Sequence, residues 1–118
     1  MNVVKYRFTA TANGVMALTT SIKTPTAFAR GWLRRVAIDI GAFTTVDVSI
    51  TDGVTSLLVD TTVTADTTYQ PQMLASKNTD GTSAGVYVDI YVEGTIAITL
   101  ANVATAGTCT VDVYIEVD

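Results

Sequence analysis

Polar and apolar residues alternate along most of the chain, and this period of two is typical of half-buried β-strands. In the run VYVDIYVEG (86–94) the Val and Ile residues share one face, which we expect to face the core, and the Tyr, Asp and Glu residues share the other. The runs TTVDVSITDG (44–53) and CTVDVYIEV (109–117) alternate in the same way and are rich in β-branched residues. These three runs are the clearest strand predictions in the chain.

Glycines near the ends of two of these runs predict tight turns. Gly94 is expected to close a hairpin in which the apolar residues of TIAITL (95–100) again face inward. The Asp52-Gly53 pair is expected to turn the chain back into TSLLVDTTVT, because Asp and Gly tolerate a positive φ angle.

The first third of the chain alternates less regularly. Strands are predicted at VVKYRFTA (3–10), with Val4, Tyr6 and Phe8 on one face, and at VMALTTSI (15–22). In WLRRVAIDI (32–40) the core face is expected to carry Val36, Ile38 and Ile40.

The same alternation assigns the neighbouring arginines. Trp32 and Arg34 would share the core face of that strand at the rim of the fold, whereas Arg35 would share the outer face with Asp39. Trp and Arg are enriched at binding hot spots, so one interpretation gives Trp32 and Arg34 to an interface and leaves Arg35 to balance neighbouring acids. The other interpretation is that Trp32 closes the end of the core and Arg34 pairs with a carboxylate of an adjacent strand.

These elements predict an all-β chain with one domain, residues 1–118. About eight short antiparallel strands would form a β-sandwich with jelly-roll-like or Greek-key topology. Residues 1–30 would contribute basic N-terminal strands or an arm, and loops are expected at 23–31 and 65–85. A long loop such as 65–85 is a place where contacts with a neighbouring protein are expected.

Composition suggests assembly with other proteins. The chain has 118 residues and a formal net charge of −4, only 15% of its residues are charged, and its mean hydropathy is +0.38. A surface so poor in charge suits burial against other proteins. The chain has no run of apolar residues long enough to span a membrane and no secretion signal at its start, so we expect a soluble protein made in a cytosol.

The charges are unevenly distributed. Residues 1–35 hold six of the seven basic residues and no acid, and residues 36–118 hold all eleven acids. The two groups could neutralise each other across strands, or the basic residues could form a patch that docks on an acidic partner.

Catalytic, metal and nucleic-acid functions find little support. The chain has no histidine, the usual general base and a common zinc ligand. Cys109 follows the alternation of its apolar neighbours and is expected to be a buried thiol. The segment KNTDGTS is too poor in carboxylates for a calcium loop. With a pI near 4.5 and no basic stripe, nucleic acid is an unsuitable partner. We predict a non-enzymatic protein without catalytic residues, cofactor or metal, and without a nucleic-acid or membrane partner.

The segments RRVAIDIGAFTTVDVSITDG and VYVDIYVEGTIAITLANVATAGTCTVDVYIEVD resemble small structural proteins of tailed-phage virions, in particular the β-sandwich decoration (cement) proteins of phage capsids. The resemblance covers about residues 30–118. It implies a protein made in the host cytoplasm that binds the capsid surface of the virion and stabilises it. The implied partners are the major capsid protein or other virion proteins, and the implied oligomer is a homotrimer. The residues expected at these contacts are Lys5, Arg7, Phe28, Arg30, Trp32 and Arg34, with Arg35 beside them.

Two alternatives stay open. The chain could be another virion component, from the neck, tail or baseplate. It could also be a carbohydrate-binding or adhesin β-sandwich, in which the outward Tyr87, Tyr91 and Tyr114 would supply an aromatic platform. The competing explanation for these tyrosines is cross-strand packing in a subunit interface.

Overall fold

The computed structural model describes residues 2–12, 21–74, 87–103 and 107–117. Ten strands are assigned within these ranges, and they are β1 (Asn2–Ala12), β2 (Ser21–Lys23), β3 (Ala27–Asp39), β4 (Val46–Thr51), β5 (Ser56–Val63), β6 (Thr67–Tyr69), β7 (Gln72–Leu74), β8 (Tyr87–Asp89), β9 (Tyr91–Ala101) and β10 (Gly107–Val117). The fold is all-β and antiparallel, as the alternation predicted. In the described part of the chain no helix has the length and apolar character needed to cross a membrane.

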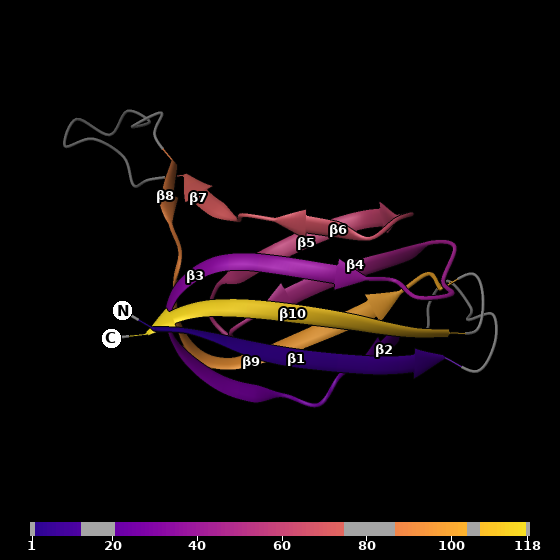
Figure 1. Ribbon diagram of the computed structural model, residues 1–118, viewed down its shortest axis with the longest axis horizontal. Coiled ribbons are helices and arrows are strands. Elements are labelled where there is room, and N and C mark those ends of the chain that lie inside the picture. Colours follow the sequence, from indigo (N-terminus) through magenta and orange to yellow (C-terminus); the bar gives the residue numbers. More distant parts are fainter. Residues whose placement is uncertain (1, 13–20, 75–86, 104–106, 118) are drawn as a thin grey trace.

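Eight of these strands form one sheet that folds over into two layers (Figure 1). Its order is β1-β10-β3-β9-β4-β5, with β6 on β3 and β2 on β9. Strand β3 pairs with β9 through its first half and with β10 through its second half. Strand β9 then leaves β3 and pairs with β4 and β2. The first layer is therefore β1-β10-β3-β6 and the second is β2-β9-β4-β5, which is a β-sandwich-like arrangement.

The core lies between the layers and consists of the inward-facing residues of alternating runs. In β10 the buried positions are Cys109, Val111, Val113 and Ile115, each with an exposed fraction of 0%. The outward neighbours in the same strand remain partly exposed. Strands β4 and β9 repeat this pattern, so the predicted inward sets of 44–53, 95–100 and 109–117 are confirmed.

The hairpin predicted at Gly94 is wrong. Strand β9 runs without interruption through Gly94, which pairs with Ala29 of β3. A Cβ atom on Gly94 would lie 2.4 Å from the carbonyl oxygen of Asp52. Glycine is needed here because the Asp52 turn approaches the β9 backbone, and no reversal of the chain occurs.

The loop predicted at 23–31 is also wrong in its second half. Strand β3 begins at Ala27, and its inward positions in this region are Ala27, Ala29 and Gly31. A Cβ on Gly31 would lie 2.3 Å from the carbonyl oxygen of Glu116, so the small residue permits a close approach of β10. Small inward residues give a weak hydrophobic signal, which is why the alternation was missed.

A β-bulge shifts the alternation within β3 and overturns the predicted faces of its first half. Tyr114 of β10 pairs with Arg35, whereas the next residue, Ile115, pairs with Leu33, so Arg34 is the extra residue of the bulge. Leu33 is buried and Trp32 faces outward with 39% of its surface exposed. Trp32 therefore does not share the face of Val36, contrary to the prediction.

The loop predicted at 65–85 contains two short strands. Strand β6 adds to the edge of β3, and β7 pairs with β8 in a separate two-stranded ribbon that projects from one end of the sandwich (Figure 1). Val88 belongs to this ribbon and is 40% exposed, so its predicted core position is wrong. Residues 75–85 of that loop, Val86 and residues 15–20 of the strand predicted at 15–22 lie outside the described residues.

Candidate interaction surface

The bulge places Arg34 in a network of internal ion pairs. Its Nε and NH2 atoms donate to the two carboxylate oxygens of Glu116 at 3.1 and 3.0 Å, and NH1 donates to Asp89 at 2.7 Å. Gln72 also donates to Asp89 at 3.1 Å, and these bonds, with that of Gln72 the larger cause, lower the pKa of Asp89. Arg34 therefore joins β3 to the end of β10 and to the base of the β7–β8 ribbon.

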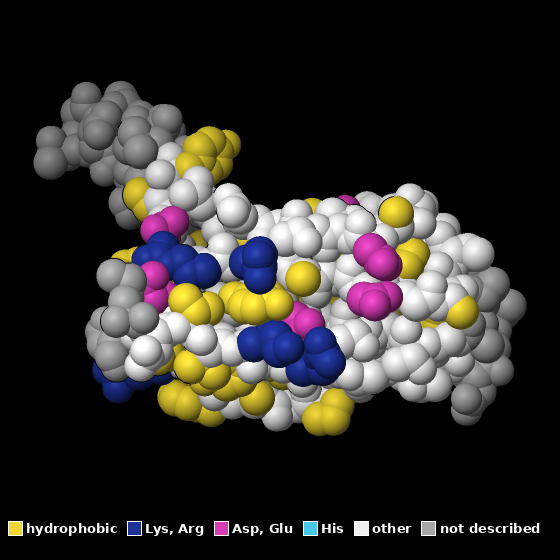
Figure 2. All heavy atoms as spheres, viewed as in Figure 1, with side chains coloured by type: hydrophobic (Ala, Val, Ile, Leu, Met, Phe, Trp, Pro, Cys, Tyr) yellow, Lys and Arg dark blue, Asp and Glu magenta, His cyan; other side chains and the backbone are white. Residues whose placement is uncertain are grey.

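Three rows of side chains cross the outward face of β1, β10 and β3. Each row has a β10 residue in the middle, a β1 residue on one side and a β3 residue on the other, and we name the rows after the middle residue. The Glu116 row is Val3-Glu116-Trp32, the Tyr114 row is Lys5-Tyr114-Arg35, and the Asp112 row is Arg7-Asp112-Ala37. The dark blue basic side chains of this face gather around apolar and acidic ones in Figure 2. The residues of each row come from both ends of the sequence, which is how basic and acidic segments meet.

In the Asp112 row the positive charge of Arg7 and the negative charge of Asp112 neutralise each other. Arg7 donates to both carboxylate oxygens of Asp112, at 2.8 and 2.9 Å. This bidentate pair lowers the pKa of Asp112. Together with the pairs of Arg34, it shows that Arg7 and Arg34 are neutralised across strands.

The Tyr114 row differs from its neighbours. The guanidinium carbon of Arg35 lies 4.1 Å from the ring centroid of Tyr114, a cation–π contact. Within the described ranges, neither Arg35 nor Lys5 has a carboxylate within ion-pair distance. The pairing of Arg34 with Glu116 of the adjacent strand β10 confirms the second interpretation of that residue. Arg35 contacts an aromatic ring, so the prediction that it balances neighbouring acids is not the observed arrangement.

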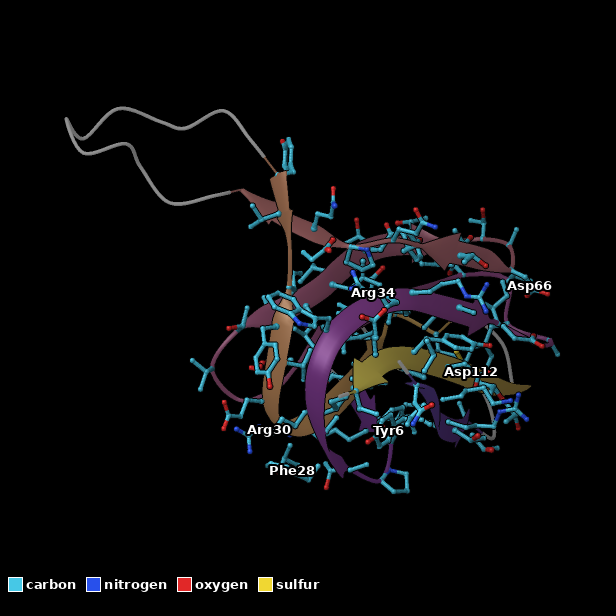
Figure 3. The ribbon with its side chains drawn as sticks, turned by 60° about the vertical axis from the view of Figure 1, so that its left-hand side comes forward. Tyr6, Phe28, Arg30, Arg34, Asp66 and Asp112 are labelled. Atoms are coloured by element: carbon cyan, nitrogen blue, oxygen red, sulfur yellow. The ribbon has the colours of Figure 1, made fainter. Side chains whose placement is uncertain are left out.

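An aromatic corner lies where the first half of β3 meets β9. The rings of Trp32 and Tyr91 have centroids 5.0 Å apart and planes at 76°. Arg30 lies 3.8 Å from Glu93. The neighbouring Tyr91 side chain, and after it the Glu93 carboxylate, raise the pKa of the Arg30 guanidinium. Figure 3 shows Arg30 and Phe28 on the part of β3 that bends away from Arg34.

Most of the exposed large hydrophobic residues lie at the end of the sandwich where β1 begins, β3 bends and the ribbon projects (Figures 1 and 3). We call this set the apolar end; its members are Val3, Val4, Phe28, Trp32, Tyr87, Val88 and Tyr91. Phe28 and Tyr87 are the most exposed, at 64% and 66%. An exposed group of apolar side chains of this kind is typical of a binding surface.

All six residues predicted to make contacts lie on strand β1 or strand β3. Phe28, Arg30 and Trp32 form an outward stripe on the first half of β3, Arg34 occupies the bulge, and Lys5 and Arg7 face outward on β1. The exposure of Val3 and Val4 was not predicted from the sequence. Alternation shows which residues of a strand share a face, but it does not show that no other described strand covers this end of β1.

The three tyrosines proposed as an aromatic platform have different surroundings. Tyr91 meets Trp32 edge-on, Tyr114 lies beneath Arg35, and Tyr87 stands on β8 of the ribbon. Of the three, Tyr91 belongs to an exposed aromatic pair with Trp32.

Cys109 is buried, as predicted. Its exposed fraction is 0%, and burial raises the pKa of its thiol to about 11. A thiol in this position is protonated near neutral pH and inaccessible to reagents.

Comparisons with known proteins show a similar fold among solved structures. No protein-family model matches the chain, and no curated protein matches it. Among solved structures, the crystal structure of FlhE is similar, with a TM-score of 0.52 over 99% of this chain and 100% of that one. The two sequences are 9% identical, so the likeness shows the fold alone.

Proposed function

We propose that this chain is a non-enzymatic structural protein of a phage virion, which binds the capsid surface and stabilises it as a decoration protein. The observation that carries the proposal is the apolar end, whose seven large hydrophobic side chains are each at least 37% exposed. The resemblance of residues 30–118 to phage decoration proteins supplies the kind of partner, the major capsid protein.

The basic side chains around the apolar end form ion pairs within the chain, as expected of a surface that is already folded before a partner binds. Arg7, Arg30 and Arg34 are each held by acids of the same chain. These pairs fix the shape of the surface and leave the apolar side chains to provide the driving force for association. Each interface could be weak, because attachment of an oligomer at several points multiplies the affinity through effective concentration.

Co-sedimentation with particles of the phage that encodes the chain tests the proposal. We expect purified chain to pellet with capsids that lack it, and Phe28→Ala to weaken this attachment about tenfold or more because it removes an exposed apolar contact. Val59→Ala is the control, since Val59 has the same exposed fraction of 64% but lies on β5 of the second layer.

The outcomes separate the candidate functions. Binding to tails or baseplates, without binding to capsids, would favour the alternative of another virion component. Absence of binding to any part of the particle would refute a virion role. If both variants bind like the wild type, the apolar end is not the contact surface.

A further inference from the structure

The Tyr114 row is the part of the outward face whose basic side chains form no ion pair with a described carboxylate. It lies between the Glu116 row, where Arg34 neutralises Glu116, and the Asp112 row, where Arg7 neutralises Asp112. Lys5 and Arg35 are both exposed, and no described carboxylate lies within ion-pair distance of either side chain. Among the described residues, two exposed cations without an ion-pair partner therefore stand in one row of a protein whose formal net charge is −4.

The contact with Tyr114 prepares Arg35 for a ligand. The ring covers one face of the guanidinium, and the N–H groups at the edge of this planar group stay available for a carboxylate. Holding the side chain against the ring also reduces the conformational entropy that binding would cost. Arg35 thus combines a fixed orientation with free donors.

A hollow of about 300 Å³ adjoins this row. It is lined by Val3, Arg34, Arg35, Gln70 and Tyr114. Gln70 adds an amide that can donate a hydrogen bond, and Val3 connects the hollow to the apolar end. The lining therefore suits a polar, negatively charged group that arrives next to an apolar contact.

We propose that the Tyr114 row and its hollow bind an acidic peptide segment of a partner protein. Lys5 and Arg35 stand on strands two positions apart in the sheet, hence about 10 Å from each other. A segment with at least two carboxylates can place one carboxylate on each cation at the same time. Because the acids of the flanking Glu116 and Asp112 rows are paired with Arg34 and Arg7, the unpaired positive charge is confined to one row, which is too short for a long, continuous polyanion such as a nucleic acid.

This inference deepens the proposed function, because it describes the chemistry of the partner at the same surface, but its test needs no capsid. A fluorescently labelled hexaglutamate peptide is titrated with the isolated chain, and the anisotropy is measured at several salt concentrations. We expect binding that weakens with salt, because exposed charges are screened.

Three single substitutions, each removing one positive charge, make the test specific. Lys5→Gln and Arg35→Gln should each weaken peptide binding by about fivefold or more, because each removes one of the two charge contacts. Lys23→Gln is the matched control, since Lys23 is also exposed but lies on β2 of the second layer, and it should leave binding unchanged. Arg35→Lys should bind between Arg35→Gln and the wild type, because it keeps the charge and loses the planar donor edge.

Three results would overturn the proposed peptide site. They are no binding of hexaglutamate by the wild type, a loss of binding in Lys23→Gln as large as in Lys5→Gln, and binding of an oligothymidylate of equal charge as tight as that of the peptide. Co-sedimentation with capsids is measured separately. Attachment that persists without peptide binding overturns this inference alone, and peptide binding without attachment overturns the capsid role alone.

Discussion

Gly94 provides a direct test of how closely β9 approaches the Asp52 turn. A Cβ atom at this position would lie 2.4 Å from the carbonyl oxygen of Asp52, whereas a normal carbon–oxygen contact is about 3.3 Å or longer. Gly94→Ala must therefore separate β9 from the Asp52 turn by almost 1 Å. The alternative role that the sequence suggested, a turn glycine, would give alanine only a backbone penalty of about 1 kcal/mol.

The Asp52 turn resists this displacement. Asp52 has 5% of its surface exposed, its carboxylate accepts the N–H groups of Val54 and Thr55 at 3.0 and 2.6 Å, and its own N–H donates to the carbonyl of Thr55 at 3.2 Å. Overpacking costs about 1–3 kcal/mol, and the loss of one turn hydrogen bond adds about 1 kcal/mol. We expect Gly94→Ala to lower the free energy of unfolding by about 2–4 kcal/mol, which in a domain of this size lowers Tm by about 10 °C or more.

Gly53→Ala is the control, because it changes a glycine of the same turn without a steric contact. Nothing lies within 4 Å of its Cβ position, and its φ of +94° limits the penalty to about 1–2 kcal/mol of backbone strain. Urea unfolding followed by the fluorescence of Trp32, the single tryptophan, measures both variants at one protein concentration. If Gly94→Ala is no less stable than Gly53→Ala, the close approach of β9 to the turn is wrong.

Three further predictions follow from burial, charge and composition. Cys109→Ala should cost about 1–2 kcal/mol through lost packing, and the thiol of the native protein should react with a thiol reagent only after unfolding; rapid labelling would contradict its burial. Burial alone would raise the pKa of Asp52, but hydrogen bonds from the N–H groups of Thr55 and Val54 lower it overall, and the pKa of Asp112 is lowered by Arg7. Both carboxylates therefore stabilise the fold fully above their ordinary pKa of 3.8, and this stability is lost as the pH falls through their lower folded pKa values. Tm should drop over that pH range, and Asp52→Asn should make the drop smaller. Sedimentation equilibrium at micromolar concentration should give an oligomer, with a trimer expected, and a mass of 12.4 kDa throughout would contradict it.

The alternation of residues was enough to determine the class of fold and much of the core. Cys109 and its inward neighbours in β10 were assigned correctly, because β-branched residues at every second position admit one buried face. The Asp52-Gly53 turn was also predicted correctly, because its chemistry is local. These are features that neighbouring residues decide among themselves.

The remaining features depend on contacts between distant parts of the chain. The bulge at Arg34 arises from the pairing of β3 with β10. It reverses the faces that strict alternation along the strand predicted for Trp32 and Arg34. Gly94 lies within β9 because the Asp52 turn passes against it, a contact that residue spacing cannot show. Alternation tells which residues of a strand share a face, but the partners of each strand decide where its register shifts and which outward residues stay exposed. For this reason the face of Lys5, Tyr114 and Arg35 could be recognised only in the tertiary structure.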